Sequence, residues 1–185
     1  MLLRSGVPFM RHNLKGEKHT EFIAAEPESC PKLTRGKFEY DFGDEAGYTP
    51  LLPMFTLGHD FKPANIHAGG LRYHGAGMII SQLVKDGYMH GVDVAQTEAF
   101  EAGMLFARVE GIIPAPESCH AIAATIREAK KATEEGKNTV ILFCLSGHGL
   151  IDMPSYESYL NGDLHDYRVS DEEINKFLQT VPQVD

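Results

Sequence analysis

One continuous apolar run, followed at once by a glycine-rich turn, constrains the fold of this chain more than any other stretch. Residues 140–145 read VILFCL, and Ser146, Gly147, His148 and Gly149 follow them. An apolar run without polar alternation is typical of a strand that is buried on both faces of a mostly parallel sheet. Open α/β sheets bind ligands at the carboxyl ends of such strands, and glycine lets the backbone approach a ligand closely. The sequence therefore predicts a binding site at this turn, with Ser146 as its hydroxyl group.

The rest of the chain alternates between extended and helical patterns. Residues 118–135 are predicted to form a helix that Ser118 caps and Gly136 ends. Residues 21–26 and 88–94 have the length and apolar content of short strands. Residues 2–14 are predicted to form a helix that is broken at Pro8 or starts there. The other predicted helices are residues 78–85 before Gly87, a helix capped by Asp93 or Thr97 that runs to Glu110 before Gly111, residues 154–160, and residues 171–179 with Ser170 and Glu173 as a capping box. This alternation predicts an α/β fold with right-handed crossovers.

Two segments depart from this alternation. Residues 31–77 are rich in Gly, Pro, Asp and aromatic residues and hold no helical or strand period for long, so they are predicted to be irregular. An ordered irregular segment of this length is usually functional. Residues 153–185 are predicted to be a helical tail. With 185 residues, the chain is long enough for one domain with its own core, so a single domain over residues 1–185 is expected.

The charge and the cysteines exclude several classes of protein. The net charge is −9, and Arg127, Lys130 and Lys131 alternate with glutamates, so no basic stripe for nucleic acid exists. Cys30, Cys119 and Cys144 are an odd number without short spacings, which fits neither a disulfide framework nor a zinc knuckle and favours buried thiols in a reducing compartment. The first residues lack the apolar run of a signal peptide or membrane anchor. A cytoplasmic protein without a membrane partner is expected.

Two catalytic interpretations of the turn residues find little support. A nucleophile elbow requires glycine two positions before and after its serine, but Cys144 and His148 occupy those positions around Ser146. Four histidines lie in glycine-rich or turn segments, yet none forms a recognised zinc-ligand spacing. They are His67, His74, His120 and His148. Hydrogen-bonded histidines are therefore favoured over a zinc site.

Glu117 and Arg72 are the charged residues with the most suggestive positions. Glu117 lies at the start of a predicted helix, where the helix dipole favours a carboxylate, so structural and functional roles remain open. Arg72 lies in a glycine-flanked loop, where its guanidinium can either clamp a carboxylate substrate or hold the loop to Asp60 or Glu117.

Several motifs together resemble a known family. They are FIAAEP at 22–27, YDFGDEAGYTPLLPMFTLGHDF at 40–61, GGLRYHG at 69–75, ARVEGIIPAPESCHA at 107–121 and ILFCLSGHGLID at 141–152. In this order they resemble the C-terminal half of the tryptophan synthase β-subunit, in particular its second, archaeal and thermophile-type branch. The resemblance extends to about Leu160. It implies the C-terminal part of the fold-type II pyridoxal-phosphate architecture, with a mostly parallel sheet flanked by helices.

The resemblance also implies roles for individual residues. Ser146, in the turn with Gly147, corresponds to the serine that hydrogen-bonds the pyridine nitrogen of pyridoxal 5'-phosphate, and Glu117 to the glutamate beside the cofactor ring. A hydroxyl partner leaves that nitrogen largely unprotonated, which favours β-elimination and β-replacement over racemisation. Gly70 and Arg72 belong to the substrate loop. The carbonyls of Leu71 and Tyr73 correspond to ligands of a monovalent cation.

The implied activity is the β-replacement of L-serine with indole to give L-tryptophan. The family's Schiff-base lysine and its GGGSN phosphate cup have no counterpart here, since none of the ten lysines stands in the lysine motif. The chain is therefore interpreted as a C-terminal portion that is inactive alone, binds the cofactor only with an N-terminal complementing chain, and forms homo-oligomers. Docking of a tryptophan synthase α-subunit is left open, because Arg72 replaces an aspartate of the main branch. The alternative is a non-catalytic remnant that acts as a binding or oligomerising module.

Overall fold

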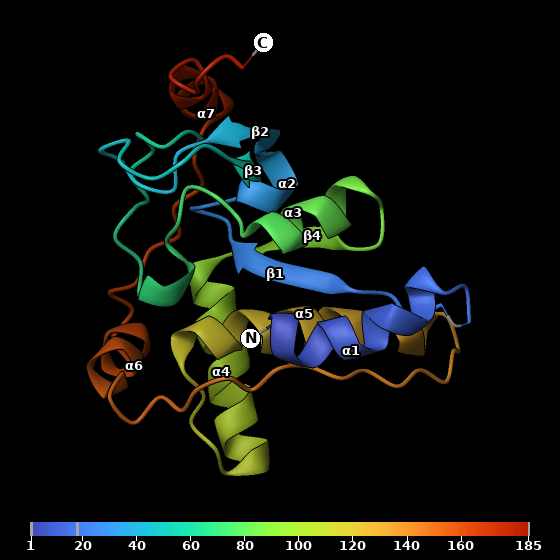
Figure 1. Ribbon diagram of the computed structural model, residues 1–185. Coiled ribbons are helices and arrows are strands. Elements are labelled where there is room, and N and C mark those ends of the chain that lie inside the picture. The colour runs from blue at the N-terminus through green and yellow to red at the C-terminus, as the bar shows by residue number, and fades with distance from the viewer. Residues whose placement is uncertain (1, 18, 185) are drawn as a thin grey trace.

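Two small sheets and seven α-helices form the part of the chain that the computed structural model describes, residues 2–17 and 19–184 (Figure 1). The predicted α/β class is confirmed. The helices are α1 (Leu2–Leu14), α2 (Lys32–Arg35), α3 (Met78–Lys85), α4 (Gln96–Glu110), α5 (Pro116–Glu134), α6 (Met153–Leu160) and α7 (Asp171–Leu178). The strands are β1 (Ile23–Pro27), β2 (Lys37–Asp41), β3 (Leu52–Thr56) and β4 (His90–Val94), and η1 (Gly69–Leu71) is a short 3-10 helix. None of the helices within those two ranges is long and apolar enough to cross a membrane.

The parallel pair β1–β4 is the part of the sheet nearest to the predicted site. Ile23 pairs with His90 and Pro27 with Val94, which confirms both predicted strands. In Figure 1, α1 and α5 lie beneath β1 and α3 lies above it. The amide of His90 donates to the carbonyl of Phe22, and the amide of Glu28 donates to that of Val94. Since backbone groups alternate in direction along a strand, those of Ile23 and Ala25 point to the opposite edge, where no described strand pairs with β1.

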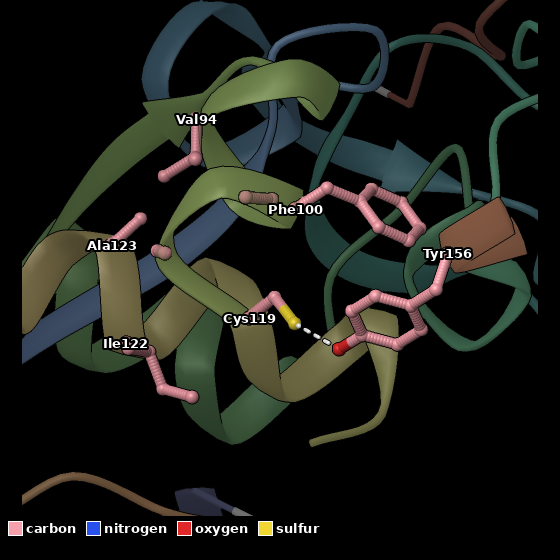
Figure 2. Packing of buried hydrophobic residues seen from close by; sticks show 8 residues of the cluster. Val94, Phe100, Cys119, Ile122, Ala123 and Tyr156 are labelled. Atoms are coloured by element: carbon pink, nitrogen blue, oxygen red, sulfur yellow. Dashed lines mark hydrogen bonds between the residues drawn. The ribbon is translucent and has the colours of Figure 1, made fainter. Parts of the chain in front are cut away.

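The main core lies between α4, α5 and α6 (Figure 2). Phe100 from α4 packs edge-on against Tyr156 from α6, with ring centroids 5.1 Å apart. The Tyr156 hydroxyl donates to the carbonyl of Pro114 at 2.6 Å and lies 3.3 Å from the Cys119 sulfur. Gly103 makes this approach possible, because a Cβ there would lie 2.5 Å from Cys119 Sγ. Burial raises the pKa of the Cys119 thiol to about 11, so this cysteine stays protonated at neutral pH.

The prediction that residues 31–77 lack regular structure is wrong. Within this segment β2 and β3 form an antiparallel hairpin, with Lys37 opposite Thr56 and Asp41 opposite Leu52. The hairpin is stabilised by a buried polar network rather than by an apolar face alone. Asp41 accepts hydrogen bonds from the Thr56 hydroxyl at 2.6 Å and from His59 Nδ1 at 2.7 Å. A carboxylate at a fully buried position does not fit an apolar strand pattern, which explains why the sequence did not predict this hairpin.

The prediction of a buried strand at residues 140–145 is also wrong. The segment is extended, but Val140 is 96% exposed and Leu142 is 73% exposed. Figure 1 shows it as a trace without an arrow that runs from α5 toward α6. A strand needs a neighbouring strand for its backbone N–H and C=O groups, and none of the described residues supplies one at this position.

Two predicted helix caps are wrong and several helix ends are confirmed. Ala95 and Ala115 precede α4 and α5, so neither Asp93, Thr97 nor Ser118 is a cap. Thr97 instead donates its amide and its hydroxyl to the Asp166 carboxylate. The confirmed features are the bounds of α3, the left-handed glycines 87, 111 and 136, the helix at residues 153–160, and Ser170, which accepts from the amide of Glu173.

Candidate cofactor site

Three of the residues that the sequence singles out, Leu71, Glu117 and Ser146, line one groove, whereas Gly70, Arg72, Tyr73 and Gly147 are not part of its lining. A cavity of about 1110 Å³ lies between the free edge of β1, helices α1 and α5, and the extended segment 139–146. Its lining includes Phe9, Ile23, Ala25, Leu71, Glu117, Ser118 and Ser146. We call this cavity the β1–α5 groove. The structure thus brings Ser146 and Glu117 to one cavity, although they come from the turn after segment 139–145 and from the first turn of α5.

Ser146 is held by a second serine. Its amide donates to the Ser118 hydroxyl oxygen at 3.2 Å, and the two hydroxyl oxygens are also 3.2 Å apart. Because the Ser118 oxygen already accepts from the Ser146 amide, the Ser118 hydroxyl can donate to Ser146 Oγ. The Ser146 hydroxyl proton is then free to be donated into the groove. In the sequence, the only signal of this role of Ser118 is a hydroxyl directly after Glu117.

Two backbone hydrogen bonds attach the Ser146–Gly149 turn to the start of α5. The Ala115 amide donates to the Gly147 carbonyl at 2.9 Å, and the Gly149 amide donates to the Ile113 carbonyl at 2.7 Å. A Cβ on Gly149 would lie 2.5 Å from the Pro114 carbonyl oxygen. Glycine at 149 is therefore required by a close approach of two backbones, and the attachment fixes the position of Ser146.

The loop that contains Gly70 and Arg72, for which a substrate-binding role is predicted, meets Glu117 at Gly70. The Gly70 amide donates to Glu117 Oε1 at 2.8 Å, and a Cβ on Gly70 would lie 3.2 Å from Glu117 Cγ. Glu117 is half-buried, and one of its carboxylate oxygens is thus oriented by the backbone of the loop. This contact links the loop to the first turn of α5, one residue before Ser118.

Arg72 lies in the same loop but is not paired with a carboxylate. Its guanidinium donates to Asn65 Oδ1 at 3.3 Å and to the Pro63 carbonyl at 3.2 Å. Among the described residues, Arg72 therefore bonds to neither Asp60 nor Glu117. The prediction that it holds the loop to one of these carboxylates is wrong. Its buried Nε has no hydrogen-bond partner among the described residues. A role for Arg72 in binding substrate stays a prediction.

The carbonyls proposed for a monovalent cation are engaged by protein groups. The Leu71 carbonyl accepts from the Tyr73 amide at 3.0 Å and from Lys32 Nζ at 3.3 Å. The Tyr73 carbonyl accepts from the Cys30 thiol at 2.8 Å.

All three cysteines are free; Cys30 and Cys119 are buried and Cys144 is half-buried.

His120 lies in helix α5 and not in a turn as the sequence predicts. The four histidines that the sequence singles out form hydrogen bonds with four different partners. These are Ser155 for His67, the Phe42 carbonyl for His74, the Pro116 carbonyl for His120, and the Leu150 amide for His148. No group of three potential ligands for a metal ion occurs among the described residues. Near Glu117, burial and the charge of that glutamate raise the pKa of Asp152, while His148 and His67 oppose this shift.

His120 should make the fold sensitive to acid. It is 2% exposed, and burial lowers its pKa below the usual 6.5, although the Pro116 carbonyl and Glu117 act in the opposite direction. The unfolded chain therefore binds a proton near pH 6.5 that the folded chain does not, so stability falls as the pH drops below that value. As the pH is lowered from about 7.5 to about 5.5, the free energy of unfolding should fall in the natural chain and fall less in His120→Asn. The difference between the two slopes should be up to about 1.4 kcal/mol per pH unit.

Urea denaturation of both proteins at each pH measures this difference. Burial raises the pKa of Glu26, which adds a contribution of opposite sign, so each comparison is made between proteins at the same pH. His165→Asn, at an exposed position, is the matched control and should follow the natural chain. Equal pH dependence of His120→Asn and the natural chain would contradict the assignment.

The sequence that builds this fold and groove identifies the class of protein. The chain matches the family described as pyridoxal-phosphate dependent enzyme over residues 6–147, and it therefore belongs to that family.

The resemblance to the tryptophan synthase β-subunit, second branch, is confirmed by individual relatives. The chain is 55% identical over 162 residues to tryptophan synthase beta chain 2 of Aquifex aeolicus, a match that covers 86% of this chain and 37% of the relative. It is 59% identical over 150 residues to the protein of that name from Thermotoga maritima (81% and 35%), and 53% identical over 175 residues to the one from Pyrococcus furiosus (95% and 39%). The chain thus spans a little over a third of the length of these relatives.

Membership of this family implies pyridoxal phosphate, and the residues of the groove fit such a group. The cofactor has a flat ring with one nitrogen atom. Ser146 offers a hydroxyl on the groove, and the hydrogen bonds around Ser118 leave its proton free to be donated. The apolar side chains of Leu71 and Ala121 also line the groove and can contact a ring. Ser146 would therefore hold the ring nitrogen. Glu117 directly precedes Ser118, the hydrogen-bond partner of Ser146.

Proposed function

We propose that this chain forms the ring-binding part of a tryptophan synthase β-type site, which replaces the hydroxyl of L-serine with indole to give L-tryptophan. One observation carries the proposal. Hydrogen bonds of 3.2 Å join Ser146 to Ser118, and one of 2.8 Å joins Gly70 to Glu117, the residue before Ser118. Three of these four residues, Glu117, Ser118 and Ser146, line the same groove. The relatives to which this chain is similar are named tryptophan synthase beta chains.

The residues of this site favour elimination and replacement chemistry. When bound, pyridoxal phosphate supplies an electron-withdrawing ring that stabilises negative charge on the substrate. Ser146 is a neutral partner for the ring nitrogen, whereas a carboxylate would hold that nitrogen protonated. The Ser118 contact and the two backbone bonds of the turn fix the direction of the Ser146 hydroxyl. Glu117 places a carboxylate in the lining of the same groove.

We propose that the lysine that attaches the cofactor comes from polypeptide outside these 185 residues. The two lysines that line the groove both face glutamates: Lys131 Nζ lies 3.7 Å from Glu128, and Lys137 Nζ lies 2.6 Å from Glu135. The hydrogen bond with Glu135 raises the pKa of Lys137, which keeps its amine protonated and not nucleophilic. This supports a complementing N-terminal chain as partner.

Reconstitution with a complementing polypeptide tests the proposal. The chain alone should show no cofactor absorbance band near the visible edge with pyridoxal phosphate, and no borohydride-stable adduct on a specific lysine. Addition of a polypeptide with the part of the Thermotoga maritima relative that this chain does not match should produce the band and form tryptophan from L-serine and indole. Absorbance spectra and chromatography measure the two results. Indole makes the assay independent of a tryptophan synthase α-subunit, whose docking is a separate proposal.

A matched pair of serine variants identifies the role of Ser146. Ser146→Ala should lower tryptophan formation by about tenfold, since it removes one hydrogen bond to the ring. Ser158→Ala, whose hydroxyl only bonds within α6, should keep the full rate. A specific lysine adduct on the chain alone, or equal rates for the two variants, would overturn the proposal.

A second candidate function is a binding or oligomerising module without catalysis. The observation that favours it is the exposed apolar segment 140–145 together with the free edge of β1, because both promote association. Analytical ultracentrifugation of the same samples separates the candidates. Stable self-association without activity after complementation favours the module, whereas dissociation of self-associated species by the complementing chain, with activity, favours the enzyme.

A further inference from the structure

The loop that orients Glu117 is itself held by two side chains from the segment after β1. Lys32 Nζ donates to the Leu71 carbonyl at 3.3 Å, and the Cys30 thiol donates to the Tyr73 carbonyl at 2.8 Å. Both side chains are placed by the short helix α2 and the turn before it. We call residues 69–73 the Gly69–Tyr73 turn.

The Lys32 ammonium lies in a protected, oxygen-rich position. Its side chain is only 12% exposed, and its nitrogen lies 3.9 Å from the carboxylate of Glu26, whose side chain is 3% exposed. Glu26 also accepts from the amides of Leu33 and Thr34. A protected ammonium is stable only where oxygen atoms surround it, and here a carbonyl and a carboxylate do so.

This arrangement does not fit a separate monovalent cation at the Leu71 and Tyr73 carbonyls, although the resemblance to the β-subunit implies one there. Carbonyl oxygens coordinate such ions through their lone pairs. The Leu71 carbonyl already accepts two hydrogen bonds, from the Tyr73 amide and from Lys32. A second cation at this oxygen would also be repelled by the ammonium.

We propose that the ammonium of Lys32 is the built-in cation of the Gly69–Tyr73 turn and replaces a bound monovalent ion. Lys32 is then a positioning residue. It fixes Leu71, the neighbour of Gly70, and the Gly70 amide in turn orients the Glu117 carboxylate at 2.8 Å. The inference concerns the turn itself and does not depend on which reaction the groove supports.

Exchange of salts on the purified chain, without cofactor, tests this proposal. The measured quantities are amide hydrogen exchange of the Gly69–Tyr73 turn and the thermal midpoint, in choline chloride, KCl and NH₄Cl at equal ionic strength. The natural chain should give the same values in all three salts. Lys32→Met should exchange this turn about tenfold faster in choline chloride, because a charged hydrogen bond is lost, and K⁺ or NH₄⁺ should partly restore its protection.

Two further variants separate charge from packing. In Lys32→Arg the amides of the Gly69–Tyr73 turn should stay protected from exchange, and this protection should not depend on the salt, since arginine keeps a cation at this position. Lys62→Met removes an exposed lysine from a nearby loop, where it pairs with Glu45, and should behave like the natural chain. The proposal is overturned if the natural chain gains protection specifically in K⁺ or NH₄⁺, or if Lys32→Met matches Lys62→Met. It is also overturned if Lys32→Met loses protection that no small cation restores. Should Lys32→Met not fold, the natural chain and Lys32→Arg decide the question through their salt dependence.

Discussion

Replacement of Phe100 by alanine is expected to lower the free energy of unfolding by about 3–5 kcal/mol. The ring is buried and contacts two aromatic side chains of α6. It packs edge-on against Tyr156 (Figure 2) and stacks on Tyr159 with centroids 5.8 Å apart. Alanine would leave a cavity between α4 and α6, and rigid neighbours fill such a cavity only in part. Urea denaturation followed by circular dichroism measures the change.

The same substitution should loosen the turn that holds Ser146. Tyr156 donates to the Pro114 carbonyl, and Pro114 lies between Ile113 and Ala115, the residues that bind the turn. Hydrogen exchange should therefore increase at the Gly149 amide as well as in α6. Tyr48→Ala, at a position 92% exposed, is the control and should leave stability nearly unchanged. A Phe100→Ala protein as stable as this control would show that α6 is not packed on α4 in this way.

Removal of the Asp41 carboxylate should have an effect of similar size. Asp41 is fully buried, and its oxygens accept from the Thr56 hydroxyl, His59 Nδ1 and the Phe42 amide. Asp41→Ala would leave these donors without an acceptor and His59 without its carboxylate. Breaking one partner of a buried pair costs about 3–5 kcal/mol, so we expect a loss of that order. Thermal and urea unfolding measure it.

A double-mutant cycle tests whether the network acts as a unit. Asp41→Ala, Thr56→Val and the double variant should show a coupling of about 0.5–3 kcal/mol, because the two side chains share a hydrogen bond of 2.6 Å. Asp163→Ala, at an exposed site, serves as the control. Additive effects of the two substitutions would contradict the network, and full stability of Asp41→Ala would contradict its burial.

The parts of the fold that the sequence predicts well are those with local signals. Helix α3 was predicted with its exact bounds, since its apolar residues have helical spacing and Gly87 adopts the left-handed conformation that ends it. The β2–β3 hairpin was missed because two of its local signals, the buried Asp41 and Pro53, are not typical of a strand. Pro53 argues against a strand, but β3 is an edge strand and tolerates a residue without an amide proton.

Features that depend on distant residues were predicted less well. The apolar composition of residues 140–145 indicates that they are suited to a buried strand, yet composition does not supply the neighbour with which a strand must pair. Hydrophobic periodicity cannot predict that Ser146 and Glu117 share one site. Only the resemblance of several motifs to a known family predicts it. The role of Ser118 was missed because a hydroxyl at the start of a helix is typical of a cap. Its partner lies 28 positions further along the chain.

The two long sides of the β1–α5 groove are synthesised far apart in time. Ile23 leaves the ribosome more than a hundred residues before Val140. At typical elongation rates of about 5–20 residues per second, the interval is about 6–23 s. During that interval the free edge of β1 is already available, whereas Ser146 does not yet exist. A polypeptide that pairs with β1 can therefore bind during translation, but a small molecule that needs both sides can bind only after the chain is nearly complete.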